Sequence, residues 1–402
     1  MHGRKAGAAL EAPPERPIET AAAGIAPGFD VQKTAQNRTG RQWAPRMWQG
    51  LNFFAWIRLA SRNGLHVSLT HAYMPLVITV VSLLHTILRL LEWLVYGRRI
   101  ARTEIREAPI FIVGHWRTGT TLLHELLTLD ERHTYPTTYE CLDPNHFLLT
   151  EGIFRRWAGF LMPTKRPMDN MASGWDRPQE DEFALCMLGQ RSPYLTIAFP
   201  NHRPHDPEYL DFEGLSDRQI ASWRRTFVGF LRKITFRRPK RLVLKSPTHS
   251  CRIKTLLEIF PDARFVHIVR DPRVVIPSTI HLWKSLYQTH GLQIPRFEGL
   301  QEYVFTNFAR LYAKLEQGRP LVDPARFHEM RYEDLVTDPI GEMERLYERL
   351  ELTDFAALKP ALARYLTEHS DYETNRYQVP GDLLREIENR CSEVIARHGY
   401  AR

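Results

Sequence analysis

The segment that most constrains the fold covers residues 112–126 and reads IVGHWRTGTTLLHEL. An apolar run over 109–113 predicts a buried strand, Gly114 and Gly119 enclose a four-residue loop, and a helix is expected over 119–129. Such a loop directs backbone N–H groups and a helix N-terminus to one place without side-chain bulk, which suits a bound phosphate. The sequence therefore predicts an anion-binding strand–loop–helix unit, with an ordinary connection as the alternative.

Further apolar runs, each followed by a helical pattern, continue this alternation along the chain. Continuous apolar strands are buried on both faces and are typical of a parallel sheet covered by helices. The predicted fold class is therefore α/β, a three-layer sandwich with a central parallel sheet and a P-loop-like anion-binding loop. Strands are expected over 241–244, 264–269 and 327–331, and helices over 250–260, from Asp271 onward and over 339–350.

The composition of the 402 residues is that of a globular chain, with 43% hydrophobic and 25% charged residues. The formal net charge of +8 fits an anionic partner such as a phosphorylated nucleotide or a membrane surface. No basic run is interleaved with aromatic residues, so nucleic-acid binding is not expected. The four cysteines lie far apart without metal-ligand spacing, which predicts reduced thiols and no metal site.

The first hundred residues differ in character from the rest of the chain. Residues 1–45 are rich in Ala, Pro and Gly and are predicted to be a flexible tail. Residues 46–100 are expected to form a helical extension, and residues 101–402 the main domain. No apolar signal-peptide core follows the N-terminus, which favours a reducing, cytoplasmic location.

Residues 74–96 form the one stretch suited to contact with a bilayer. Only about 15 of them run without a charge, fewer than the roughly 20 that a membrane-spanning helix needs. Trp93 and Tyr96, followed by Arg98 and Arg99 where the helix is expected to end, are typical of an interfacial anchor. Peripheral or monotopic membrane association is predicted, with a buried helix and a true span as open alternatives.

The predicted loop matches the pattern G-x-x-x-x-G-K-[ST] of ATP-binding proteins except at one position. Thr120 stands where an ATPase has its lysine, and the positive charge lies inside the loop at Arg117. Transfer of a γ-phosphoryl group relies on Mg²⁺ and that lysine. A sulfuryl group, by contrast, is transferred as a nearly neutral SO₃-like species. The hydroxyls and the one guanidinium of this loop would therefore suffice to stabilise its transfer without a metal.

Two segments resemble those of the sulfotransferases that use 3′-phosphoadenosine 5′-phosphosulfate (PAPS), in particular the bacterial-type branch. The run RTGTT at 117–121 resembles the 5′-phosphosulfate loop of that family, read as [RK]-x-G-T-[TS]. Residues 269–278, VRDPRVVIPS, resemble its 3′-phosphate segment, with Arg270 at a strand end and Ser278 eight positions later. The resemblance covers roughly residues 108–400.

This resemblance implies PAPS as the sulfuryl donor, no required metal, and a sulfotransferase catalytic domain over 101–402. Two anion sites at neighbouring strand ends would hold the two phosphate-bearing ends of one nucleotide, in the crevice where open α/β sheets bind ligands. Near the C-terminus, the family's loop over the nucleotide corresponds to residues 373–377. The implied donor-binding residues are Arg117, Thr118, Gly119, Thr120, Thr121, Arg270, Ser278 and Arg376.

Sulfuryl transfer to an alcohol needs a base for the acceptor hydroxyl and a positive group on the leaving phosphate oxygen. Arg117 suits the second role, and Lys245 resembles the lysine that several branches place near the bridging oxygen. Glu140 and His249 are both candidates for the base, and the sequence leaves the choice open. Glu140 follows the loop arginine at a separation seen in other branches, and His249 lies four residues after Lys245. The remaining candidates are His115, His124, His146 and the acids Glu180, Asp181 and Glu182.

The segment over 150–210 mixes aromatic residues and methionines, among them Met162, Met168, Met187 and Tyr194. This content suits an apolar acceptor pocket, and it equally suits a helical cap on the core. The leading hypothesis is a PAPS-dependent sulfotransferase acting on a hydroxyl of a lipid or other apolar acceptor. The alternatives are an ATP- and Mg²⁺-dependent kinase and a non-catalytic, membrane-associated adaptor with a nucleotide-binding fold.

Overall fold

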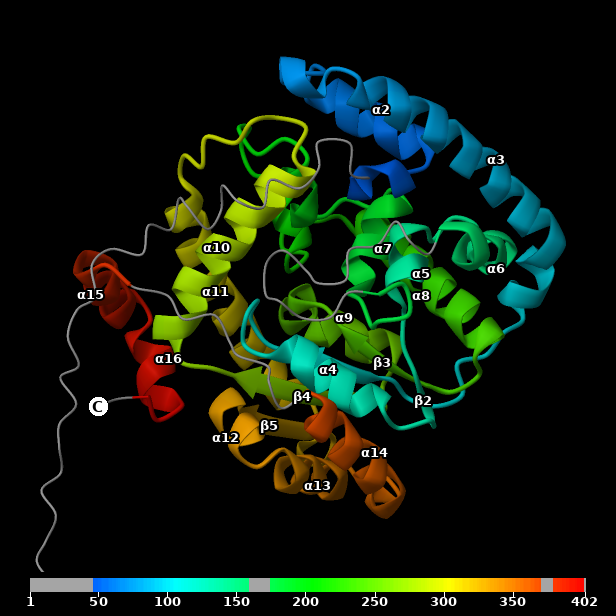
Figure 1. Cartoon of the computed structure of the whole chain (residues 1–402). Helices are drawn as coiled ribbons and strands as arrows, with labels where there is room; N and C mark the ends of the chain where they lie inside the picture. The colour runs from blue at the N-terminus through cyan, green and yellow to red at the C-terminus, as the bar shows by residue number, and fades with distance from the viewer. Residues whose placement is uncertain (1–45, 159–173, 370–378, 401–402) are drawn as a thin grey trace, which may run out of the picture. The chain divides into compact units, whose positions relative to one another are not determined.

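A computed structural model of the chain describes residues 46–158, 174–369 and 379–400 (Figure 1). Several sequence predictions fall outside these residues. They are the flexible tail over 1–45, the methionines Met162 and Met168, and the nucleotide-covering loop with Arg376.

In the described part of the chain, five parallel strands form one sheet in the order β2-β3-β1-β4-β5. The four strands expected from the apolar runs are all present, which confirms the α/β fold class. The additional strand β2 has two residues, too few for a recognisable pattern. The strands are β1 (Ile110–Val113), β2 (His133–Thr134), β3 (Arg241–Lys245), β4 (Arg264–Val269) and β5 (Phe327–Arg331).

Strand β1 lies between β3 and β4, and this order brings the predicted site segments together. Ile112 pairs with Lys245 of β3 on one side and with Val266 of β4 on the other. Because the strands are parallel, their carboxyl ends meet at one edge of the sheet. The loop after β1 therefore lies between Lys245 and Arg270.

Helices cover both faces of the sheet, and successive residues of β1 point into opposite layers. Phe111 belongs to a core cluster with side chains of α8, α10 and α11, whereas Ile112 belongs to a second cluster with side chains of α4, α13 and α14. Figure 1 shows α10 and α11 on one side of β4 and β5, and α13 and α14 on the other. The helices are α4 (Thr120–Thr128), α8 (Asp217–Arg237), α10 (Pro272–His290), α11 (Leu300–Gly318), α13 (Pro339–Arg349) and α14 (Phe355–Glu368).

The region between β3 and β4 departs from the predicted helix over 250–260. A 3-10 helix, η6 (Pro247–Cys251), comes first, and the α-helix α9 (Ile253–Ile259) begins only afterwards. Pro247 at the first helical position favours the early turn. The other helices of the main domain are α5 (Thr138–Leu142), α6 (Phe147–Ala158), α7 (Asp181–Met187), η4 (Pro193–Ile197), η5 (Pro207–Tyr209), η7 (Arg319–Leu321), η8 (Pro324–Arg326), α12 (Tyr332–Thr337), α15 (Gly381–Arg390) and α16 (Ser392–Arg397).

The N-terminal extension consists of two short 3-10 helices and the α-helices α2 and α3. Trp48 and Trp56 are buried and anchor it to the core. Helix α3 runs through Gly97 without a break and ends at Ala101, two residues beyond the Arg98–Arg99 pair where its end was expected. The guanidinium of Arg99 lies over the Phe236 ring of α8 and holds the last turn in place. The elements are η1 (Met47–Gly50), α2 (Phe53–Arg62), η2 (Leu69–His71) and α3 (Met74–Ala101).

Candidate active site

The loop between β1 and α4 depends on two glycines that no other residue could replace without rearrangement. Gly119 has φ 99°, and a Cβ there would lie 2.3 Å from the ring of Tyr332. Gly114 has φ 151°, and a Cβ there would lie 2.6 Å from the carbonyl oxygen of Ile268. The loop is therefore held tightly between β4 and α12.

The N-terminus of α4 has the properties of an anion site. No side chain in the described part of the chain caps this helix, and its first turn contains no acidic residue. The first backbone N–H groups of a helix have no partner within the helix and carry partial positive charge. Arg117 adds a cation within the loop and has the rare backbone angle φ 72°. These features fit a bound phosphate or sulfate group.

The two predicted anion-binding segments touch each other. Arg117 Nε donates to Ser278 Oγ at 2.8 Å, and Ser278 lies buried on α10. Arg270 Nη1 lies 3.4 Å from the carbonyl oxygen of Arg117, and its guanidinium stacks 4.0 Å from the centroid of the Tyr332 ring. Thr118 is buried and donates its hydroxyl to the carbonyl oxygen of His115, so its side chain holds the loop closed. The structure thus gathers the guanidinium groups of Arg117 and Arg270 beside the α4 N-terminus.

Three consecutive acids at the start of α7 pair with three bases, one at the end of β3 and two in the segment that follows it. Lys245 pairs with Glu180 at 2.8 Å, His249 with Asp181 at 2.9 Å, and Arg252 with Glu182 at 2.6 Å. The last two pairs are fully buried, whereas the Glu180 side chain is 15% exposed. The first pair alone therefore reaches solvent.

A chain of hydrogen bonds joins Glu180 to the anion-binding loop. The hydroxyl of Tyr194 donates a hydrogen bond to Glu180 Oε2 at 2.5 Å, and Trp116 Nε1 donates one to the hydroxyl oxygen of Tyr194 at 2.9 Å. Burial, together with the negative charge of Glu180, raises the pKa of Tyr194 well above its usual value. The phenol therefore stays protonated and orients the carboxylate beside Lys245.

The two leading candidates for the base both lie in enclosed positions. Glu140 is fully buried, closes the capping box of α5 with Thr137, and accepts from Arg238 at 2.8 Å. His249 is also fully buried and lies edge-on to the ring of Phe111. Burial alone would raise the pKa of Asp181, but the neighbouring His249 holds it below its usual value. Structural contacts thus account for the positions of both candidates.

The other histidine candidates are also placed by the fold. His115 is fully buried in the loop, and this burial lowers its pKa to about 4. His124 is buried on α4, with Nε2 3.1 Å from the carbonyl oxygen of Val243. His146 lies next to α3 in a separate cluster with His85. In the methionine-rich segment, Met187 is part of the core.

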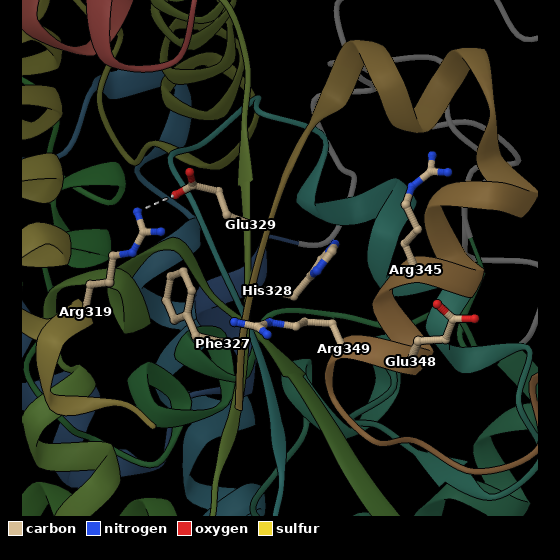
Figure 2. A pocket seen from close by; sticks show the side chains of 7 residues that line it. All are labelled: Arg319, Phe327, His328, Glu329, Arg345, Glu348 and Arg349. Atoms are coloured by element: carbon tan, nitrogen blue, oxygen red, sulfur yellow. Dashed lines mark hydrogen bonds and ion pairs between the residues drawn. The ribbon is translucent and has the colours of Figure 1, made fainter. Parts of the chain in front are cut away.

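A cavity of about 600 Å³ lies at the free edge of the sheet, beside the first residues of β5 (Figure 2). The first residues of β5 lie at the amino-terminal ends of the parallel strands, whereas the anion-binding loop follows the carboxyl end of β1. The cavity is therefore separate from that loop. The pair Arg319–Glu329 crosses one side of it. Its lining consists of Arg319, Phe327, His328, Glu329, Arg345, Glu348 and Arg349.

The sequence placed Glu180 only among the remaining candidates for the base and Tyr194 only in the mixed aromatic and methionine segment, and it did not predict the contacts that join them to Lys245 and Trp116. A signal was present in the spacing of charges, because three adjacent acids are matched by three bases at 245, 249 and 252. Such a match becomes meaningful only once α7 is known to lie against the segment that follows β3. That contact joins residues about 65 positions apart, and no local pattern encodes it.

Comparison with known proteins identifies relatives over most of the chain. A family model described as the sulfotransferase family matches residues 109–356. Two curated relatives, the omega-hydroxy-beta-dihydromenaquinone-9 sulfotransferases Stf3 of Mycobacterium bovis and Mycobacterium tuberculosis, are each 52% identical over 362 residues. These alignments cover 90% of this chain and 93% of each relative.

Solved structures show the same fold at lower sequence identity. Sulfotransferase STF1 from Mycobacterium tuberculosis H37Rv is 19% identical with a TM-score of 0.59, and the match covers 84% of this chain and 90% of that one. Sulfotransferase STF9 from Mycobacterium avium is 20% identical with a TM-score of 0.61, and the match covers 85% and 95%.

Proposed function

This chain belongs to the sulfotransferase family, and we propose that it transfers the sulfuryl group of PAPS to the hydroxyl of a long, apolar, quinone-type lipid. The acceptor class rests on the two relatives at 52% identity, whose names specify an ω-hydroxylated dihydromenaquinone. A hydroxyl at the end of such a molecule is the nucleophile that sulfuryl transfer requires.

The residues around the loop fit PAPS as the donor. The uncapped N-terminus of α4 and Arg117 suit the 5′-phosphosulfate, while Arg270 and Ser278 suit the 3′-phosphate. Thr120 in place of the lysine of ATP-binding loops disfavours a kinase. Arg376 remains a proposed additional contact to the 3′-phosphate.

We propose Glu180 as the base, and the ion pair between the buried Lys245 and the partly exposed Glu180 is the single observation that carries this mechanism. Glu180 accepts the proton of the acceptor hydroxyl while the acceptor oxygen forms its bond to sulfur. The bond between sulfur and the phosphate oxygen breaks, and Lys245 and Arg117 stabilise the charge left on that oxygen. The partial exposure of Glu180 favours it over Glu140 and His249, since both of those side chains are fully buried.

We propose that α3 holds the enzyme at a membrane surface, where such an acceptor resides. One stripe of α3 is buried against the protein and includes Ile78, His85 and Glu92. The opposite face exposes large apolar side chains, and Arg98 and Arg99 follow in the last turn. Residues 69–101 are the one helical stretch among those described that is long and apolar enough to cross a membrane. The exposed apolar side chains are Leu76, Val80, Leu83, Leu84, Ile87, Leu90, Leu91, Trp93, Leu94 and Val95.

The proposed function is tested with PAPS labelled in its sulfuryl group and an ω-hydroxylated menaquinone in mixed micelles. The expected result is a labelled product that has gained one SO₃ group, formed with or without Mg²⁺. The desulfonated product PAP should stabilise the protein by about 2.7 kcal/mol at a hundred times its dissociation constant.

Each alternative function gives a different result. Phosphorylation of the acceptor with ATP and Mg²⁺ would establish the kinase. Stabilisation by PAP without a sulfated product would overturn the acceptor class and retain the donor. A protein that neither PAP nor ATP stabilises, and that forms no product, would be the adaptor.

A further inference from the structure

A second cluster of polar side chains lies where α3 packs against the main domain, outside the proposed active site. His85 comes from the middle of α3, and Asp143 and His146 come from the connection between α5 and α6. Their side chains are 11%, 17% and 4% exposed, so they are largely enclosed. The mechanism of sulfuryl transfer makes no use of them.

Three atoms with lone pairs converge in this cluster. Asp143 Oδ1 lies 3.1 Å from His85 Nδ1 and 3.0 Å from His146 Nε2. The two imidazole nitrogens are 2.5 Å apart, closer than an ordinary N–H···N hydrogen bond. Asp143 Oδ1 is buried, yet it accepts no hydrogen bond of normal geometry from any described residue. Hydrogen bonds among the three side chains therefore do not satisfy all of their buried polar atoms.

The surroundings determine which nitrogen of His146 carries a proton. Thr150 Oγ donates to the carbonyl oxygen of His146 at 3.1 Å and lies 2.9 Å from His146 Nδ1. Because the hydroxyl hydrogen of Thr150 is used in this bond, its oxygen accepts a hydrogen bond from Nδ1–H of His146. His146 Nε2 then has a free lone pair directed toward His85 and Asp143. Metal-binding histidines are commonly oriented by such a second hydrogen bond.

From this geometry we infer that His85, Asp143 and His146 bind a divalent transition-metal cation, with Zn²⁺ as the best chemical match. Two imidazoles and one carboxylate form a common zinc ligand set, and a water completes four-coordination. Tetrahedral ligands at about 2.1 Å from zinc are about 3.4 Å apart, so modest side-chain movements suffice.

Neighbouring charges are compatible with a cation at this place. One of them is Lys233, which pairs with Glu92 of α3 and donates to the carbonyl oxygen of Pro144 at 2.6 Å. Because Glu92 offsets the lysine, the cluster keeps the negative charge of Asp143. A metal bound here joins α3 to the α5–α6 connection and fixes the orientation of the exposed apolar face.

The test measures zinc in the full-length protein. Protein stripped with a chelator and dialysed against low-micromolar Zn²⁺ should retain about one zinc per chain by mass spectrometry, and its melting temperature should rise. X-ray absorption at the zinc edge should report two imidazole nitrogens. His146→Gln and Asp143→Asn should each raise the zinc dissociation constant by about a hundredfold or more, whereas the exposed control His66→Gln should leave it unchanged.

Both variants must first show the wild-type circular dichroism spectrum and stabilisation by PAP, which establish that they are folded. Asp143→Asn preserves the volume of the side chain and serves as the second variant where His146→Gln fails to fold. Wild-type protein that retains no zinc would overturn the proposal and leave a proton shared by the two imidazoles. Equal zinc binding by wild type and both variants would likewise overturn it, because the metal would lie elsewhere.

Discussion

At the scale of single residues, exposure separates groups that are otherwise chemically similar. Glu180, Asp181 and Glu182 are adjacent in sequence and each pairs with a base. Only the carboxylate of Glu180 reaches solvent, and it is the one linked through Tyr194 to the anion-binding loop. The chain thus holds two ion pairs fully inside the fold, whereas the carboxylate of the third is partly exposed to solvent.

Replacement of this carboxylate tests the proposed base. Glu180→Gln should lower kcat by about 10²- to 10⁴-fold, because the amide cannot accept the proton of the acceptor hydroxyl. The affinity for PAP, measured by calorimetry, should stay within a few-fold of wild type, since Arg117 and Arg270 are intact. Turnover is followed with labelled PAPS across pH.

Glu140→Gln is the matched control for that experiment. Glutamine still closes the capping box of α5, but the charge that faces Arg238 is lost. We expect a lower melting temperature with nearly normal kcat in the folded protein. The opposite pattern, with kcat lost in Glu140→Gln and retained in Glu180→Gln, would move the base to Glu140.

At the scale of elements, local pattern predicted the strands well and the surroundings of the site poorly. The strands over 109–113 and 264–269 are continuous apolar runs, and the structure contains both. β2 escaped prediction because two residues carry no periodicity. Helix α3 continues two residues past the expected Arg98–Arg99 end, and a contact of Arg99 with the Phe236 ring holds this last turn against α8. The ion-pair partners of the acids at the start of α7 could not be predicted from local pattern, because they depend on how α7 packs against the end of β3 and the segment after it.

Helix α3 provides the prediction at this scale. Leu84→Asp combined with Ile87→Asp places two charges on its exposed face without touching the buried stripe. Each apolar side chain that enters a membrane contributes about 1.5–3 kcal/mol, so binding should weaken by at least about a hundredfold. Flotation with vesicles of phosphatidylglycerol and phosphatidylcholine measures it.

Val336→Asp is the control for vesicle binding, because it changes an exposed apolar residue on α12 instead. This variant should bind vesicles as the wild type does. If the α3 double variant also floats unchanged, the membrane-surface role of this helix is refuted. Both variants should retain stabilisation by PAP, since neither touches the anion-binding loop.

At the scale of the whole molecule, buried histidines make stability depend on pH. Burial lowers the pKa of His115 to about 4, and burial together with Arg62 lowers the pKa of His205 to about 4. An unfolded histidine has a pKa near 6.5, so between pH 4 and 6.5 the unfolded chain binds protons that the folded chain excludes. Acid therefore favours unfolding throughout this window.

The free energy of unfolding should accordingly fall as pH is lowered from 6.5 to 4.5, by about 1.4 kcal/mol per pH unit for each such histidine. Urea titrations across this range measure the slope. His205 lies outside the loop between β1 and α4, and its replacement by glutamine removes one titrating group. The slope of the free energy of unfolding against pH should therefore be smaller in His205→Gln, by the contribution of about one proton. Carboxylates such as Asp130, whose pKa Arg132 lowers to about 2 against the effect of burial, lose their contribution only below about pH 4. An unchanged slope in His205→Gln would contradict this prediction. It would show that the His205 imidazole takes up its proton in the folded protein as readily as in the unfolded chain.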